Sequence, residues 1–174
     1  MRIDTWNAPD DLRYDRALLA DLTSLRFLDE HQSAIVLGPV GVGKTHLATA
    51  LGHMAIRRRH TVSFARADKL FTRLRAARLD NTVDAEIRRL SAIDVLIIDD
   101  FALRPLDATE TSDFYEIVVQ RHHTMTTIVT SNREVDLLGR SARGGRGSAR
   151  SGARARSRDT HREQLADVGR CWRQ

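Results

Sequence analysis

Residues 38–45 constrain the fold of this chain more than any other segment. They read Gly-Pro-Val-Gly-Val-Gly-Lys-Thr and match the pattern G-x-x-x-x-G-K-[ST] at every position. Glycines let such a loop turn its backbone N–H groups inward toward an anion, and the helix that follows adds its positive N-terminal end. The flanks fit this use, since four apolar residues, 34–37, precede the loop and Leu47 and Leu51 follow it at helical spacing. The segment therefore predicts a strand, a phosphate-binding turn and a helix.

The alternation of short strands and amphipathic helices continues through the body of the chain. Runs typical of buried strands occupy residues 34–37, 61–65, 95–98 and 127–130. Helical spacing predicts a helix after Thr45 with Leu47, Leu51, Met54 and Ala55 on one face, a helix capped by Asp68 that buries Leu70, Phe71 and Leu74, a helix over 83–90, and a helix traced by Leu106, Phe114, Ile117, Val118 and Arg121. Strands that alternate with helices imply a parallel sheet with right-handed crossovers. We therefore expect an α/β P-loop domain over residues 1–138.

The phosphate loop assigns roles to its own side chains. Lys44 is expected to reach the β- and γ-phosphates of ATP, and the Thr45 hydroxyl to ligate Mg²⁺. The residues predicted to contact the nucleotide are Gly38, Pro39, Gly41, Val42, Gly43, Lys44, Thr45 and His46.

Polar residues follow the third and fourth predicted strands. Asp99 and Asp100 come directly after the apolar run 95–98, and in a parallel sheet this end faces the same crevice as the phosphate loop. Asp99 is expected to hold Mg²⁺ together with Thr45, and Asp100 to orient or deprotonate the attacking water. Asn132, at the tip of the fourth strand, is placed to contact that water or the γ-phosphate. The predicted catalytic set is thus Lys44, Asp100 and Asn132.

Composition excludes several other classes of protein. The 174 residues contain one cysteine, Cys171, so neither an internal disulfide nor a cysteine-based zinc cluster can form. No apolar run reaches the roughly 18 residues of a membrane span, and the N-terminus has no apolar signal segment. We expect a cytoplasmic protein with no membrane partner.

The net charge of +5 is unevenly distributed along the chain. Residues 1–138 carry a net charge of −2 and residues 139–174 one of +7. Residues 139–158 consist only of Arg, Gly, Ser and Ala, which offer no large apolar side chain to bury. The segment 139–174 is therefore predicted to be a disordered basic tail. Its arginines could bind nucleic acid without sequence preference, or could simply be solvated.

Four segments together resemble the IstB-type helper ATPases of insertion sequences, which are AAA+ relatives of the DnaC helicase loaders. These segments are residues 38–48, 97–106, 111–117 and 130–134, with weaker similarity at 14–19 and 25–28. The resemblance implies an AAA+-type three-layer domain that binds ATP and Mg²⁺, binds DNA as a homo-oligomer and assists a transposase.

The resemblance ends near residue 136, and the phosphate loop starts only 37 residues from Met1. We expect the family's N-terminal helical region to be absent, and its fifth strand, helical lid and trans-acting arginine to be replaced by the basic tail through a frameshift. Residues 34–37 are then an exposed sheet edge, and ATP hydrolysis is weak although binding is retained. Two alternatives stay open: a replicative helicase-loader-like ATPase, and a non-cycling remnant that binds nucleic acid only through its tail.

Overall fold

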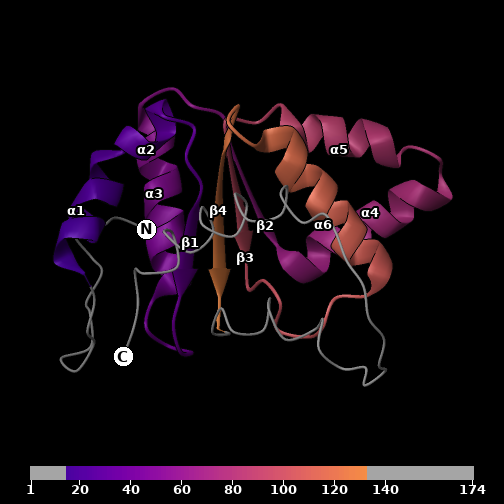
Figure 1. Ribbon diagram of the computed structural model, residues 1–174, viewed down its shortest axis with the longest axis horizontal. Coiled ribbons are helices and arrows are strands. Elements are labelled where there is room, and N and C mark those ends of the chain that lie inside the picture. The colour runs from indigo at the N-terminus through magenta and orange to yellow at the C-terminus, as the bar shows by residue number, and fades with distance from the viewer. Residues whose placement is uncertain (1–14, 133–174) are drawn as a thin grey trace, which may run out of the picture.

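Four short strands form a parallel sheet in the computed structural model, which describes residues 15–132 (Figure 1). The strands are β1 (Ala34–Leu37), β2 (Val62–Arg66), β3 (Val95–Asp99) and β4 (Thr126–Ser131), in the spatial order β1-β4-β3-β2. Every residue of the two central strands, β3 and β4, is buried. The four predicted strands and the α/β class are confirmed, and the strand order places the end of β4 beside the phosphate loop.

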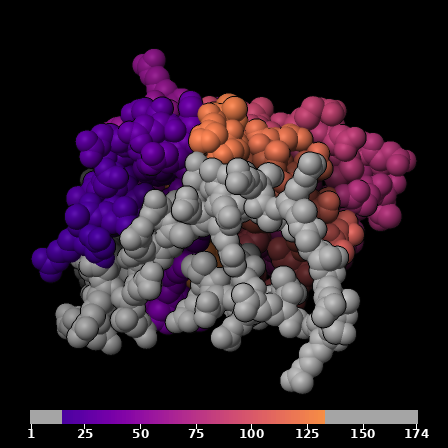
Figure 2. All heavy atoms as spheres, in the orientation of Figure 1, coloured from indigo at the N-terminus to yellow at the C-terminus, as the bar shows by residue number. Residues whose placement is uncertain are grey.

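Helices cover both faces of this sheet. They are α1 (Arg16–Ser24), α2 (Arg26–Asp29), α3 (Lys44–Arg57), α4 (Ala67–Leu79), α5 (Val83–Ser91) and α6 (Ala108–Arg121). The first three lie on one side of the sheet and the last three on the other (Figures 1 and 2). Because strand side chains alternate in direction, Ile97 packs with α3 while Leu96 and Ile98 pack with α4, α5 and α6. The predicted three-layer sandwich is confirmed.

Three local predictions need correction. Asp68 does not cap α4: the cap residue is Arg66, and Asp68 lies in the first turn of the helix. Leu106 precedes α6, which begins after Asp107 because the Asp107 carboxylate accepts the Glu110 N–H at 2.8 Å and the Glu110 carboxylate accepts the Asp107 N–H at 3.1 Å. Val118, predicted on the buried face of α6, is 37% exposed.

Two short helices at the start of the described chain contribute to the core. In α1, Leu22 is buried, and in α2 Phe27 and Leu28 are buried in the same cluster as Leu47 and Leu51 of α3. The sequence patterns of strands and helices did not predict these elements, although residues 14–19 and 25–28 carry part of the family resemblance.

Arg121 at the end of α6 is buried, with 1% of its surface exposed. Its guanidinium donates to the carbonyl oxygens of Leu90 and Ile93 at 2.6 and 2.7 Å, and to Thr127 Oγ1 at 2.9 Å. It also donates to Thr126 O. Burial lowers the pKa of Arg121 to about 10, and Asp94 acts in the opposite direction, so the side chain remains a cation at neutral pH. Arg121 therefore ties the end of α5 to the starts of β3 and β4.

Gly52 permits the close packing of α3 on the sheet. A Cβ atom at this position would lie 2.8 Å from Ile97 Cδ1 and 3.4 Å from Val62 Cγ1. Gly52→Ala is expected to lower the free energy of unfolding by about 1 kcal/mol. Overpacking destabilises the core by about 1–3 kcal/mol, and the higher helix propensity of alanine offsets up to about 1 kcal/mol of that loss.

The paired variant Ile97→Val tests this explanation. It removes Cδ1, so in its presence Gly52→Ala is expected to become neutral or stabilising. Urea denaturation of the two single variants and the double variant measures this coupling. Additive losses would contradict the packing explanation.

Some predictions concern residues at or beyond the limits of the described chain. Within residues 15–132, β1 pairs with β4, and Ala34 and Val36 of β1 are buried. The expected loss of a fifth strand, and with it the exposed edge at residues 34–37, concerns residues outside the described part of the chain and stays a prediction. The predicted disordered tail, 139–174, lies outside the described residues. Among the helices between residues 15 and 132, none combines the length and the apolar composition of a membrane-spanning segment.

Candidate functional site

The predicted site residues come together at the carboxyl ends of the strands. The phosphate loop leaves β1 after Leu37, Asp99 is the last residue of β3, and Asn132 follows β4 directly. The Gly38 N–H donates to Ser131 O at 3.3 Å, which ties the start of the loop to the end of β4. The sheet order thus produces the convergence expected at this edge.

The phosphate loop depends on glycine at two positions. Gly41 and Gly43 have φ values of +90° and +88°, in the left-handed region that side-chain-bearing residues rarely adopt. Gly43 is also the cap residue of α3, so the loop passes directly into the helix N-terminus. At the tip of the loop, Val40 is 81% exposed.

Lys44 opens α3 and is 8% exposed. Its Nζ donates to Pro39 O at 2.6 Å, so the side chain folds back over its own loop. Burial lowers the pKa of Lys44, while the charges of Asp100 and Asp99 act to raise it. The negative charges of both acids therefore favour the protonated form of Lys44.

Thr45 and Asp99 are in direct contact. Thr45 Oγ1 donates to Asp99, at 3.0 Å from each carboxylate oxygen. Asp99 is 3% exposed although it carries two acceptor oxygens, and Thr130 Oγ1 donates to its Oδ1 at 2.5 Å. Because the Thr45 proton is directed to Asp99, the lone pairs of this hydroxyl remain available to a cation.

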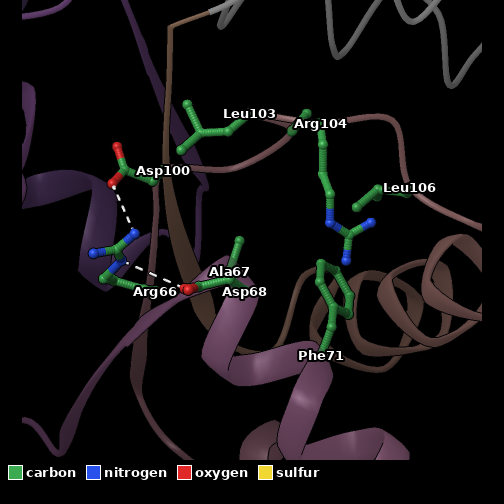
Figure 3. A pocket seen from close by; sticks show the side chains of 9 residues that line it. Arg66, Ala67, Asp68, Phe71, Asp100, Leu103, Arg104 and Leu106 are labelled. Atoms are coloured by element: carbon green, nitrogen blue, oxygen red, sulfur yellow. Dashed lines mark ion pairs between the residues drawn. The ribbon is translucent and has the colours of Figure 1, made fainter.

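Asp100 lies in a sharp turn immediately after β3. Its φ is +56°, uncommon for a residue with a side chain, and its N–H donates to Thr130 Oγ1 at 3.0 Å. Arg66, the last residue of β2, places Nη2 3.9 Å from Asp100 Oδ2 and Nε 3.4 Å from Asp68 Oδ1 (Figure 3). Arg66, Asp68 and Asp100 line an open hollow. Phe71, Leu103 and Arg104 also line it (Figure 3).

Thr130 and Arg66 are two neighbours of the acids Asp99 and Asp100 that the sequence patterns did not predict. Thr130 was expected only as a strand residue, and Arg66, which follows the predicted strand 61–65, was given no role. The one sequence signal for Thr130 is its position two residues before Asn132. Asn132 itself is partly buried at the end of β4, and His46 lies in the first turn of α3.

The donor set fits a hard cation. Among residues 15–132 there is no group of three or more His, Cys, Asp or Glu side chains that could hold a metal ion by themselves. The Thr45 hydroxyl and the carboxylates of Asp99 and Asp100 are all oxygen donors. Mg²⁺ in nucleotide sites is typically held by one or two carboxylates together with the phosphates, so this set is compatible with Mg²⁺.

One protein family and several individual proteins are similar in sequence to this chain. The family described as IstB-like ATP binding protein matches residues 7–139. The chain is 37% identical over 119 residues to an ATP-binding protein of insertion sequence IS21 from Pseudomonas aeruginosa, covering 68% of this chain and 45% of the relative. It is 43% identical over 118 residues to an insertion-sequence ATP-binding protein of Mycobacterium tuberculosis, covering 67% and 47%. The chain thus spans about half the length of these relatives.

Solved structures agree on the fold. The crystal structure of the DnaC helicase loader superposes with a TM-score of 0.65 at 20% identity, over 97% of this chain and 86% of that one. The replication initiator DnaA, bound to AMPPCP and single-stranded DNA, superposes with a TM-score of 0.63 at 21% identity, over 70% and 39%. At such identities the likeness shows the fold alone, that of an AAA+ P-loop domain.

Proposed function

This chain belongs to the IstB-like ATP-binding protein family, and we propose that residues 1–138 are an ATP- and Mg²⁺-binding AAA+ module of a transposition helper. The observation that carries the proposal is the contact of Thr45 Oγ1 with both oxygens of Asp99 at 3.0 Å, beside a loop with the full phosphate-binding pattern. Two residues 54 positions apart in the chain meet where a bound triphosphate would carry its metal.

Different groups of this chain would bind the phosphates, the metal ion and the attacking water. Backbone N–H groups of the loop and the N-terminus of α3 would bind the phosphates. Lys44, whose Nζ donates to Pro39 O, would donate to a phosphate oxygen when the nucleotide is bound. The residues that would hold Mg²⁺ are Thr45 and Asp99, and the bound ion would neutralise phosphate charge. Asp100, whose side chain is 31% exposed, would orient the attacking water, and Asn132 would contact that water or the γ-phosphate.

The partners are proposed from the relatives. Those that match at 37% and 43% identity are ATP-binding proteins of insertion sequences, which supports action on DNA with a transposase. The cytoplasmic location and the homo-oligomer that the family resemblance implies are part of the same proposal. Likeness to the DnaC loader at 20% identity reflects the fold and does not favour a role in helicase loading.

Calorimetric titration of the full chain with ATP in Mg²⁺ buffer tests this function. We expect saturable binding with a dissociation constant between about 1 µM and 1 mM, the usual range for enzyme substrates. A second titration, with duplex DNA and with or without ATP, tests the coupling. No heat on adding ATP would overturn the proposal, and DNA affinity unaffected by ATP would favour a non-cycling remnant.

A further inference from the structure

We propose that Thr130 is a positioning residue that orients both acids of the site through its single hydroxyl. The proposal rests on the function proposed above. Thr130 is fully buried in the central strand β4. Its Oγ1 donates to Asp99 Oδ1 at 2.5 Å and accepts the Asp100 N–H at 3.0 Å. One hydroxyl thus connects the side chain of the first acid to the backbone of the second.

The register of the sheet accounts for this placement. Ile98 of β3 lies opposite Val129 of β4, so Thr130 falls one position beyond, level with Asp99. Its side chain therefore meets Asp99 at the strand ends. The backbone of the same residue also contributes, because the Phe101 N–H donates to Thr130 O at 2.8 Å.

The contact restricts two motions that would impair a metal site. A carboxylate can rotate about its last bond, and the Asp99 carboxylate accepts hydrogen bonds from two hydroxyls: Thr130 donates to Oδ1, and Thr45 Oγ1 lies 3.0 Å from both oxygens. Asp100 adopts a left-handed φ of +56°, a conformation that costs free energy unless its surroundings hold it. The Thr130 hydroxyl fixes the plane of the Asp99 carboxylate, and its acceptance of the Asp100 N–H stabilises the turn.

Thr130→Val tests the role of the hydroxyl, since valine has nearly the same shape and no hydrogen-bonding group. Fluorescent-ATP binding to the full chain is measured in EDTA and then against increasing Mg²⁺. In EDTA we expect the affinity of the variant to stay within about 2-fold of the parent protein. We expect Mg²⁺ to improve nucleotide affinity about 10-fold less in the variant than in the parent, a difference of about 1.4 kcal/mol.

Two comparisons separate hydrogen bonding from packing. Thr130→Ser and Thr130→Ala both lose the methyl group and differ only in the hydroxyl, so the serine variant should follow the parent and the alanine variant should follow Thr130→Val. Thr126→Val is the matched control: Thr126 is buried on the same strand, and within the described part of the chain its Oγ1 has no hydrogen-bond partner. It should leave the Mg²⁺ dependence unchanged. Thermal unfolding verifies that each variant is folded.

The outcomes are distinct. Parent-like Mg²⁺ dependence in Thr130→Val, or equal impairment of the serine and alanine variants, would overturn the role of the hydroxyl while leaving the proposed function intact. If the parent protein itself shows no Mg²⁺-dependent nucleotide binding, the proposed function fails, and the role of Thr130 fails with it.

Discussion

Lys44→Ala is expected to weaken Mg-ATP binding by at least about 100-fold. Lys44 is largely buried beside the loop that its Nζ crosses to reach Pro39 O, so its charge is directed into the site rather than into solvent. A charged partner for a phosphate in a partly desolvated site contributes about 2–5 kcal/mol, and 100-fold corresponds to about 2.8 kcal/mol. Titration with a fluorescent ATP analogue measures the loss.

Lys69→Ala is the matched control for this variant. The only other lysine of the chain, Lys69, is exposed on α4. Lys69→Ala removes the same charge and side chain but should leave nucleotide affinity within about 2-fold of the parent. Circular dichroism should show the parent fold in both variants. If the two variants bind ATP equally well, the loop does not hold the triphosphate.

Arg121→Met is expected to lower the free energy of unfolding by about 3–5 kcal/mol. Methionine can replace much of the apolar stem but donates no hydrogen bond, so the carbonyl oxygens of Leu90, Ile93 and Thr126 lose a donor in the protein interior. A buried polar group left without a partner costs about 1–3 kcal/mol, and several are affected together. Urea denaturation measures the change.

Arg57→Met serves as the control, because Arg57 is an exposed arginine in the last turn of α3. Its loss should stay within about 0.5 kcal/mol. Under conditions where Arg121→Met is folded, its ATP affinity should match that of the parent, since Arg121 lies at the opposite end of β4 from the phosphate loop. A stability loss below about 1 kcal/mol would show that water replaces the guanidinium.

Local patterns predicted the strands well and the helix boundaries less well. The strands are short apolar runs whose burial leaves few alternatives. The start of α4 was misplaced at Asp68 because an acidic residue suits both the cap and the first turn, and only backbone geometry separates the two. The start of α6 depends on the reciprocal hydrogen bonds of Asp107 and Glu110, a spacing that the apolar periodicity does not include.

The burial of Arg121 could not be predicted from the sequence, for a different reason. Its position on the apolar stripe of α6 was visible in the sequence, but an arginine at a helix end usually reaches solvent or the helix dipole. Its burial depends on five acceptors drawn from the end of α5, the two residues before β3, and the start of β4. No spacing within α6 contains that information.

The sequence alone determined the phosphate loop, the acids after the third strand and the α/β class, because each depends on residues that are neighbours along the chain. Tertiary structure alone decided that Thr130 from β4 and Arg66 from β2 lie beside those acids. It also brought Thr45 of α3, the predicted partner of Asp99, into contact with that carboxylate. The physical reason is the strand order β1-β4-β3-β2, which makes spatial neighbours of segments some 30 to 95 residues apart.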